Sequence, residues 1–232
     1  MKKARKALVV IVILNIYLSL VSGSDTTSAT MEIAERILID FNNIDEKENW
    51  QIINDDVMGG VSQSEIIFND TGTATFQGKI SLENNGGFAS TRSKSHSYRL
   101  GGYIGLHVRI QGDGKDYQLR VRTDNRFDGI SYRYRFATQP ETWMNIRVPF
   151  SEFVPVFRGR IQSNVSPISP EQIQQVGFLI SDKQAGKFRI EIDWIKAYKY
   201  NMESSCLRQD VLSQKPSCLL PCSAGRSNHI LC

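Results

Sequence analysis

Strict alternation of apolar and polar residues most constrains what this chain can fold into. Segments 103–110, 116–122 and 130–136 place an apolar side chain at almost every second position. Successive side chains of a β-strand point to opposite faces, so this period predicts strands that are buried on one face only. The chain is therefore expected to be all-β, with about nine or ten short antiparallel strands packed as a sandwich.

The remaining strands are predicted from shorter apolar runs. The last run, 187–200, alternates through Trp194, which is predicted to share a face with the preceding apolar residues. Segment 153–160 contains a proline and a glycine and is expected to be a loop. Ser169 precedes a proline and predicts an N-cap for one helical turn over 170–174. The other predicted strands are 37–41, 64–68, 73–77, 88–91, 142–150 and 176–181.

Two glycine pairs interrupt the early strands, in segments 54–62 and 84–92. Paired glycines permit positive φ or close backbone approach, and the neighbouring Asn and Asp residues favour turns. The segments are either hairpin turns or the rim of a binding site. The predicted binding residues are Asp55, Asp56, Met58, Gly59, Gly60, Ser62, Asn85, Gly86, Gly87 and Arg92.

The adjacent acids Asp55 and Asp56 are the first place to look for catalysis. In a strand or an extended loop their side chains point in opposite directions, which is poor geometry for a paired acid and base. His96 and His107 have no neighbouring pattern of a triad or a zinc site. The sequence also contains none of the common nucleotide-binding, hydrolase or metalloprotease motifs. We therefore predict a protein that is not an enzyme and has no cofactor, and catalysis through Asp55 or Asp56 is the weakest hypothesis.

Four arginines occupy the polar positions of two neighbouring predicted strands. If those strands pair, Arg120, Arg122, Arg133 and Arg135 share one face. One interpretation is a solvent-exposed face on which nearby aspartates form salt bridges. The other is a concave face that binds an anion or a sugar, with Tyr or Trp at its rim. The flanking aspartates are Asp113, Asp116, Asp124 and Asp128.

The ends of the chain have a different composition from its middle. Residues 1–23 join a basic start to an apolar stretch and small residues, which predicts a signal peptide; an uncleaved anchor and a mitochondrial presequence are the alternatives. Four of the 28 Lys and Arg residues lie there, so the rest carries 24 basic and 24 acidic residues. A neutral protein gives no argument for nucleic acid as a partner. Polar residues 24–36 are predicted to be a linker, and no later stretch could span a membrane.

All the cysteines lie in the tail, residues 201–232. In a secreted chain an even number of cysteines predicts disulfides, here of unknown connectivity, and zinc is a weak alternative. Asn69 begins an Asn-Asp-Thr glycosylation sequon in a predicted turn. The predicted disulfide-forming residues are Cys206, Cys218, Cys222 and Cys232.

Several motifs together resemble the complex I intermediate-associated protein 30 family. They are Trp50 with Asn-Asp-Asp-Val-Met-Gly-Gly-Val-Ser at 54–62, and Phe-Gln-Gly-Lys-Ile-Ser-Leu-Glu-Asn-Asn-Gly-Gly-Phe-Ala-Ser-Thr-Arg at 76–92. Further matches are Trp143 with Val-Pro-Phe and Phe-Val-Pro before 156, and Ile-Asp-Trp-Ile at 192–195. The likeness covers about 37–200, which we take as the domain, and omits the tail.

The resemblance implies a galactose-binding-domain-like jelly-roll sandwich. It also implies a mitochondrial, chaperone-like assembly factor for respiratory NADH dehydrogenase that docks a protein partner, an assembly intermediate, without catalysis. The predicted signal peptide instead places the protein in the secretory pathway. A secreted carbohydrate-binding module is therefore the alternative function.

Overall fold

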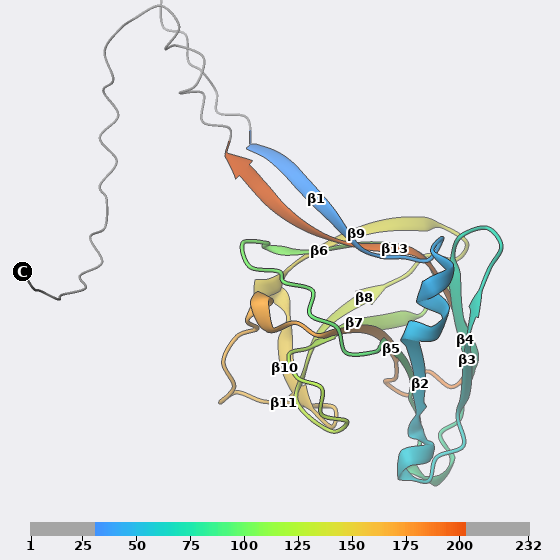
Figure 1. Cartoon of the computed structure of the whole chain (residues 1–232). Helices are drawn as coiled ribbons and strands as arrows, with labels where there is room; N and C mark the ends of the chain where they lie inside the picture. The colour runs from blue at the N-terminus through green and yellow to red at the C-terminus, as the bar shows by residue number, and fades with distance from the viewer. Residues whose placement is uncertain (1–30, 203–232) are drawn as a thin grey trace, which may run out of the picture. The chain divides into compact units, whose positions relative to one another are not determined.

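The protein is described by a computed structural model that covers residues 31–202, drawn in colour in Figure 1. Its strands form two sheets, and the pairings among β2 to β13 are all antiparallel. The first sheet has the order β3–β4–β13–β6–β9, and β1 also pairs with β13. Its strands are β1 (Met31–Asp40), β3 (Gln63–Phe68), β4 (Ala74–Ile80), β6 (Gly105–Gln111), β9 (Trp143–Pro149) and β13 (Gly186–Met202).

The second sheet is seven-stranded, in the order β11–β10–β8–β7–β12–β5–β2. Pairing of β7 with β8 places Arg120 opposite Arg133, so the four arginines do share one face. This sheet also carries the glycine-rich segments, which adjoin the ends of β2 and β5. Its strands are β2 (Trp50–Asn54), β5 (Ala89–Ser93), β7 (Asp116–Arg122), β8 (Ser131–Ala137), β10 (Val154–Phe157), β11 (Arg160–Ile161) and β12 (Gln175–Ile180).

The core lies between the two sheets and is built from the inward residues of the alternating strands. Phe76 of β4 packs edge-on against Phe188 of β13, with ring centroids 5.0 Å apart. From the other sheet, Tyr117 and Phe178 are fully buried. The half-buried strands predicted from period two are thus confirmed, because each contributes its apolar face to this core.

Short 3₁₀ helices are the only helices in the described part of the chain, and none of them is long enough to cross a bilayer. The predicted turn after Ser169 is one of them, and Ser169 occupies its N-cap position, but the Ser169 side chain makes no capping hydrogen bond. The Ser169 hydroxyl instead donates to Glu171 Oε2 at 2.8 Å. The helices are η1 (Ile44–Asn49), η2 (Asp55–Met58), η3 (Glu83–Asn85), η4 (Phe150–Glu152) and η5 (Pro170–Gln172).

Two predictions about strands were wrong. Segment 153–160 is not a loop, because β10 pairs with β8 near the sheet edge, where a proline is tolerated. In β13 the register shifts between Ile192 and Trp194, so Ile195 rather than Trp194 continues the core face. Such a bulge adds one residue and reverses the facing of every later side chain. Trp194 therefore packs outside the core, edge-on against His107.

The domain begins earlier than the sequence predicted. Residues 31–36 of the expected linker form the first half of β1, which pairs with β13. The segment Ile33–Asn201 forms one compact unit. The expected signal peptide at 1–23 and the four tail cysteines lie outside the described residues.

Candidate functional site

The Asp55 carboxylate joins the two glycine segments. Asp55 is the first residue of η2 and is fully buried. Its Oδ1 accepts a hydrogen bond from the Ser62 backbone N–H at 2.9 Å, and its Oδ2 accepts one from the Ser62 hydroxyl at 2.6 Å. Oδ2 also accepts from the backbone N–H groups of Gly87 at 2.6 Å and Phe88 at 3.3 Å. The carboxylate thus holds segment 84–92 against its own loop.

The positions around Asp55 require glycine for two different reasons, backbone conformation and lack of space. Gly59 has φ +88°, a left-handed conformation, and its N–H donates to the Asp56 carbonyl at 2.9 Å. Gly60 and Gly86 are required for space. A Cβ at Gly60 would lie 2.3 Å from Asp55 Cγ, and one at Gly86 would lie 2.5 Å from Asp55 Oδ2. The carboxylate therefore fills space that any side chain at these two positions would occupy.

Asp55 must be ionised to accept all these hydrogen bonds. Burial by itself raises the pKa of the Asp55 carboxyl, but the hydrogen bonds from Ser62, Gly87 and Phe88 outweigh burial and hold this pKa below its ordinary value. When folding lowers the pKa of a carboxyl, that carboxyl stabilises the folded protein at every pH above its pKa in the unfolded chain, which is about 3.9 for Asp. This stabilisation is lost as the pH falls through the lower pKa that the carboxyl has in the folded protein.

The pH dependence of stability checks this assignment. We expect Asp55→Asn to be less stable than the wild type by an amount that is constant from about pH 7 to pH 5 and shrinks below about pH 4. Urea unfolding followed by circular dichroism at a series of pH values measures the difference. Asp56→Asn, one residue further on, controls for the lost charge. A difference for Asp55→Asn that stays constant down to about pH 3 would contradict the assignment.

The predicted site residues separate into two groups. Asp55 and Ser62 are buried, and bind each other and the protein backbone; Asp55 begins a 3₁₀ turn rather than lying in an extended loop. Neither presents a free polar group to a ligand. Asp56 and Met58 are exposed, and Met58 has 61% of its surface accessible. Asn85 is also exposed and has φ +60°, as expected for a turn.

A cleft of about 550 Å³ lies beside this loop, on the face of the seven-stranded sheet that points away from the core. Val57, Met58 and Phe88 of the glycine segments line it together with Phe127 of the β7–β8 loop. Val57, Met58 and Phe127 are 55%, 61% and 62% exposed, so they form an apolar rim. Other lining residues are Ile53, Ser90, Arg92, Arg120, Arg122, Asp128, Gly129, Ser131, Arg158, Gly159, Leu179 and Ser181.

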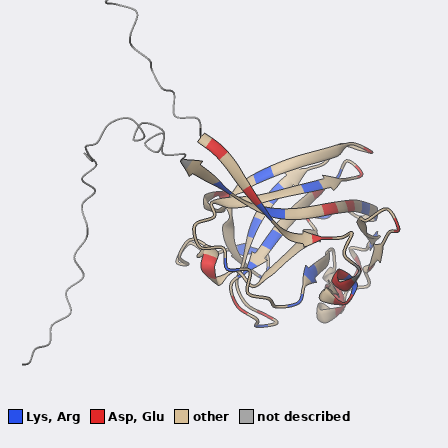
Figure 2. Cartoon of the chain, turned by 45° about the horizontal axis from the view of Figure 1, so that its top comes forward, with Lys and Arg blue, Asp and Glu red and all other residues tan. Residues whose placement is uncertain are grey.

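The floor of the cleft contains Arg92, Arg120 and Arg122. Figure 2 shows that Lys and Arg residues form blue bands along several strands of the protein. Arg92 was predicted to be a site residue and does line the cleft. The salt-bridged interpretation of the arginine face was wrong for most of its members. Of the four arginines that share it, Arg135 alone contacts a carboxylate, that of Asp182, within the described part of the chain.

Chemically, the cleft offers hydrogen-bond donors and apolar contacts. Its lining, within residues 31–202, includes no His, Cys or Lys, and its one carboxylate, Asp128, is bound by Arg158 at 2.5 Å. No group of three His, Cys, Asp or Glu residues in that range is placed to hold a metal ion. Phe127 lies at the rim where Tyr or Trp was expected. Its only signal in the sequence is that it is an aromatic residue within a polar loop.

Asn69 lies at a turn, as predicted, but its amide nitrogen is engaged. It donates to the Thr73 hydroxyl at 2.9 Å and to the Thr75 hydroxyl at 3.0 Å. Attaching a glycan to this nitrogen would require at least one of these hydrogen bonds to break.

The sequence comparison decides the family. The profile of the family described as complex I intermediate-associated protein 30 matches residues 39–192, about two thirds of the chain, including both glycine segments. The chain belongs to this family. A relative from Mus musculus named "Complex I intermediate-associated protein 30, mitochondrial" is 26% identical over 198 residues, which is 76% of this chain and 60% of the relative. A Caenorhabditis elegans relative, named as a probable protein of the same kind, is 26% identical over 68% of this chain and 52% of its own length.

This family member therefore spans between half and two thirds of the length of those relatives. Among solved structures, it is similar to a family 11 carbohydrate-binding module of a Clostridium thermocellum cellulase, with a TM-score of 0.55 and 18% identity over 72% of this chain and 95% of that one. The same kind of module in complex with a mixed-linked tetrasaccharide gives a TM-score of 0.53 and 20% identity, over 73% and 96% of the two chains. The fold is thus a galactose-binding-like jelly-roll sandwich.

Proposed function

We propose that this family member is a non-catalytic binding protein that docks a protein partner during the assembly of mitochondrial respiratory complex I. The family and the names of its relatives support the assembly role. The observation that carries the docking role is the apolar rim of Val57, Met58 and Phe127 beside a floor of arginines. Aromatic residues, Met and Arg are enriched where proteins bind each other.

The buried Asp55 gives this rim its rigidity. Asp55 begins the same 3₁₀ turn that presents Val57 and Met58, and its bonds tie the start of this turn to Ser62, further along the same segment, and to Gly87 in the second glycine segment. A preformed apolar contact loses less conformational entropy on binding than a mobile one. The family motif at 54–62 is therefore proposed to build the rim rather than to perform chemistry.

The relatives' names support a mitochondrial location, which was the alternative to secretion. The secretory expectation depends on residues 1–23 and on the tail cysteines, and the comparisons lend it no support. Fluorescence microscopy of the chain with a C-terminal tag separates the two locations directly. Signal in mitochondria supports the assembly role, and signal confined to the secretory pathway counts against it.

The carbohydrate-binding alternative has only the likeness of fold behind it, at 18–20% identity. The aromatic side chains that line the cleft in the described structure are Phe88 and Phe127, with no Tyr or Trp. Phenylalanine lacks the polar handle that lets Tyr and Trp serve both apolar and hydrogen-bonded contacts. The protein partner is therefore favoured.

Complementation in the organism of origin tests the proposal. Deleting the gene should lower the amount of assembled complex I on blue-native gels, and the wild-type chain should restore it. The double variant Val57→Ser and Met58→Ser should restore it poorly, because it removes the apolar rim while the bonds of Asp55 remain. Ile67→Ser, which truncates a 40% exposed residue on the other sheet, is the matched control. Normal complex I after the deletion would refute the assembly role.

A further inference from the structure

Three guanidinium groups gather around one glycine on the floor of the cleft. Gly177 of β12 lies opposite Arg92 of β5 on one side and opposite Arg120 of β7 on the other. Arg122 is the next outward-facing residue of β7 and lies opposite Gln175. A Cβ at residue 177 would lie 2.7 Å from Arg92 Cβ, so only glycine leaves the space between the two arginine strands open.

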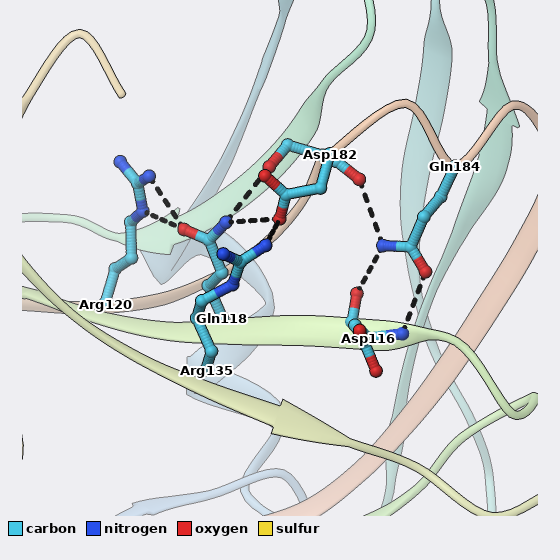
Figure 3. A network of polar contacts seen from close by, with 7 residues as sticks. Asp116, Gln118, Arg120, Arg135, Asp182 and Gln184 are labelled. Carbon is cyan, nitrogen blue, oxygen red and sulfur yellow. Dashed lines mark hydrogen bonds and ion pairs between the residues drawn. The ribbon is translucent and has the colours of Figure 1, made fainter. Parts of the chain in front are cut away.

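Neutral groups rather than carboxylates hold Arg120. Figure 3 shows its guanidinium against Gln118, whose Oε1 accepts from Arg120 Nη2 at 2.8 Å and from Nε at 3.2 Å. Arg120 Nη1 donates to the Ser131 hydroxyl at 3.2 Å. The nearest acid in this network, Asp182, is bound by Arg135 and by the Gln118 amide. Asp182 is therefore already occupied.

The other acids near the cleft are occupied in the same way. Arg126 binds Asp124 at 2.6 Å, and Arg158 binds Asp128. Within residues 31–202, Arg122 donates only to the Arg126 carbonyl, at 3.0 Å, and Arg92 makes a single long hydrogen bond of 3.5 Å to the Phe127 carbonyl. The Nε atoms of Arg92 and Arg122 are buried and have no hydrogen-bond partner among the described residues.

This arrangement is electrostatically costly for the protein alone. The pKa of Arg92 is lowered to about 10, mainly by burial and secondly by the neighbouring charge of Arg122. The pKa of Arg120 is also lowered to about 10, mainly by burial and then by the charges of Arg133 and Arg122. Both groups stay protonated at neutral pH, so the cleft holds positive charges that repel one another. A negative ligand would relieve this repulsion.

Building on the proposed function, we propose that Arg92, Arg120 and Arg122 bind the carboxylate of an Asp or Glu side chain in an acidic, partly apolar segment of the partner protein. Arginine matches a carboxylate with two parallel N–H···O bonds. Among the described residues, the terminal guanidinium nitrogens of Arg92 and Arg122 make one hydrogen bond each, so donors remain for a carboxylate. The apolar rim of Val57, Met58 and Phe127 accommodates the side chains that flank the acid. A cleft of about 550 Å³ is much larger than a lone carboxylate or phosphate ion needs, which favours a peptide segment.

Two fluorescent peptides and the full-length chain test this proposal. One peptide alternates Glu with Leu and Phe, and the second has Gln at every Glu position. Fluorescence anisotropy at low salt should show the Glu peptide binding at least about tenfold more tightly than the Gln peptide. The double variant Arg120→Gln and Arg122→Gln should lose this preference. The double variant Lys187→Gln and Arg189→Gln removes two exposed charges from β13 of the other sheet and should keep it.

Two further measurements keep the outcomes distinct. The single variant Arg122→Gln is the substitute if the double variant unfolds, because the one hydrogen bond of Arg122 in the described structure is to a backbone carbonyl. Its preference for the Glu peptide should also fall. Inorganic phosphate is titrated separately by calorimetry. Equal binding of the two peptides, or binding of phosphate without the Glu peptide, would overturn the proposal. If the Glu peptide fails to bind while the wild-type chain restores complex I in cells, this inference is refuted and the assembly role is not. If the Glu peptide binds but complex I is normal after the gene is deleted, the assembly role is refuted and this inference is not.

Discussion

Asp55→Ala is expected to lower the free energy of unfolding by about 3–5 kcal/mol. The substitution leaves the N–H groups of Ser62, Gly87 and Phe88 and the Ser62 hydroxyl without their acceptor. An unsatisfied buried donor costs about 1–3 kcal/mol, and the sum is reduced because water can enter the space that the carboxylate leaves. Urea unfolding followed by circular dichroism measures the change.

The neighbouring acid supplies the control for Asp55→Ala. Asp56 is exposed, so Asp56→Ala should change the unfolding free energy by no more than about 0.5 kcal/mol. If the two alanine variants were equally stable, Asp55 would not be the residue that joins the glycine segments. A loss limited to Asp55→Ala would also explain why the family motif contains an acid although the cleft needs none.

Gly60→Ala is expected to cost about 2–3 kcal/mol, because the new Cβ would overlap the Asp55 carboxyl. Gly59→Ala meets no atom within 4 Å and should cost only the strain of a left-handed residue, about 1–2 kcal/mol. The two effects differ in origin, and a double-mutant cycle with Asp55→Ala separates them. Chemical unfolding of the single and double variants supplies the four free energies that each cycle requires.

The overlap predicts coupling at Gly60 and none at Gly59. Removing the Asp55 carboxyl also removes the two nearest atoms that a Cβ at residue 60 would meet, so the cost of Gly60→Ala should fall in the Asp55→Ala background. The cost of Gly59→Ala should stay the same. Additive free energies at both positions would contradict a steric role for Gly60.

Alternation alone was enough to predict three strands that lie inside the sheets rather than at their edges. Strands β6, β7 and β8 follow the predicted pattern because each has one face in the core and one outside it. Strand β2 was missed because its Trp-Gln-Ile-Ile-Asn sequence is too short and irregular to show a period. Strand β10 was missed because its proline indicated a loop, and only the pairing with β8 shows that it lies near the sheet edge.

The bulge in β13 illustrates a limit of the same argument. The sequence continues to alternate through Trp194, yet the chain inserts one extra residue at Asp193. β13 pairs with β6 on both sides of the inserted residue, and the local sequence does not record that pairing. The alternation therefore predicted the strand and failed on which side chains face the core after the bulge.

The sequence by itself determined the family, the sheet content, the row of arginines and the two glycine pairs, because these depend on local periods and motifs. The tertiary structure alone decided that Asp55 bonds to Gly87, 32 residues away, since this contact depends on the pairing of β2 with β5. It also decided that Arg120 and Arg122 bind no carboxylate within residues 31–202. Asp124, Asp128 and Asp182 are near in the fold, but each is bound by another arginine, and competition for a partner is settled only by three-dimensional distance.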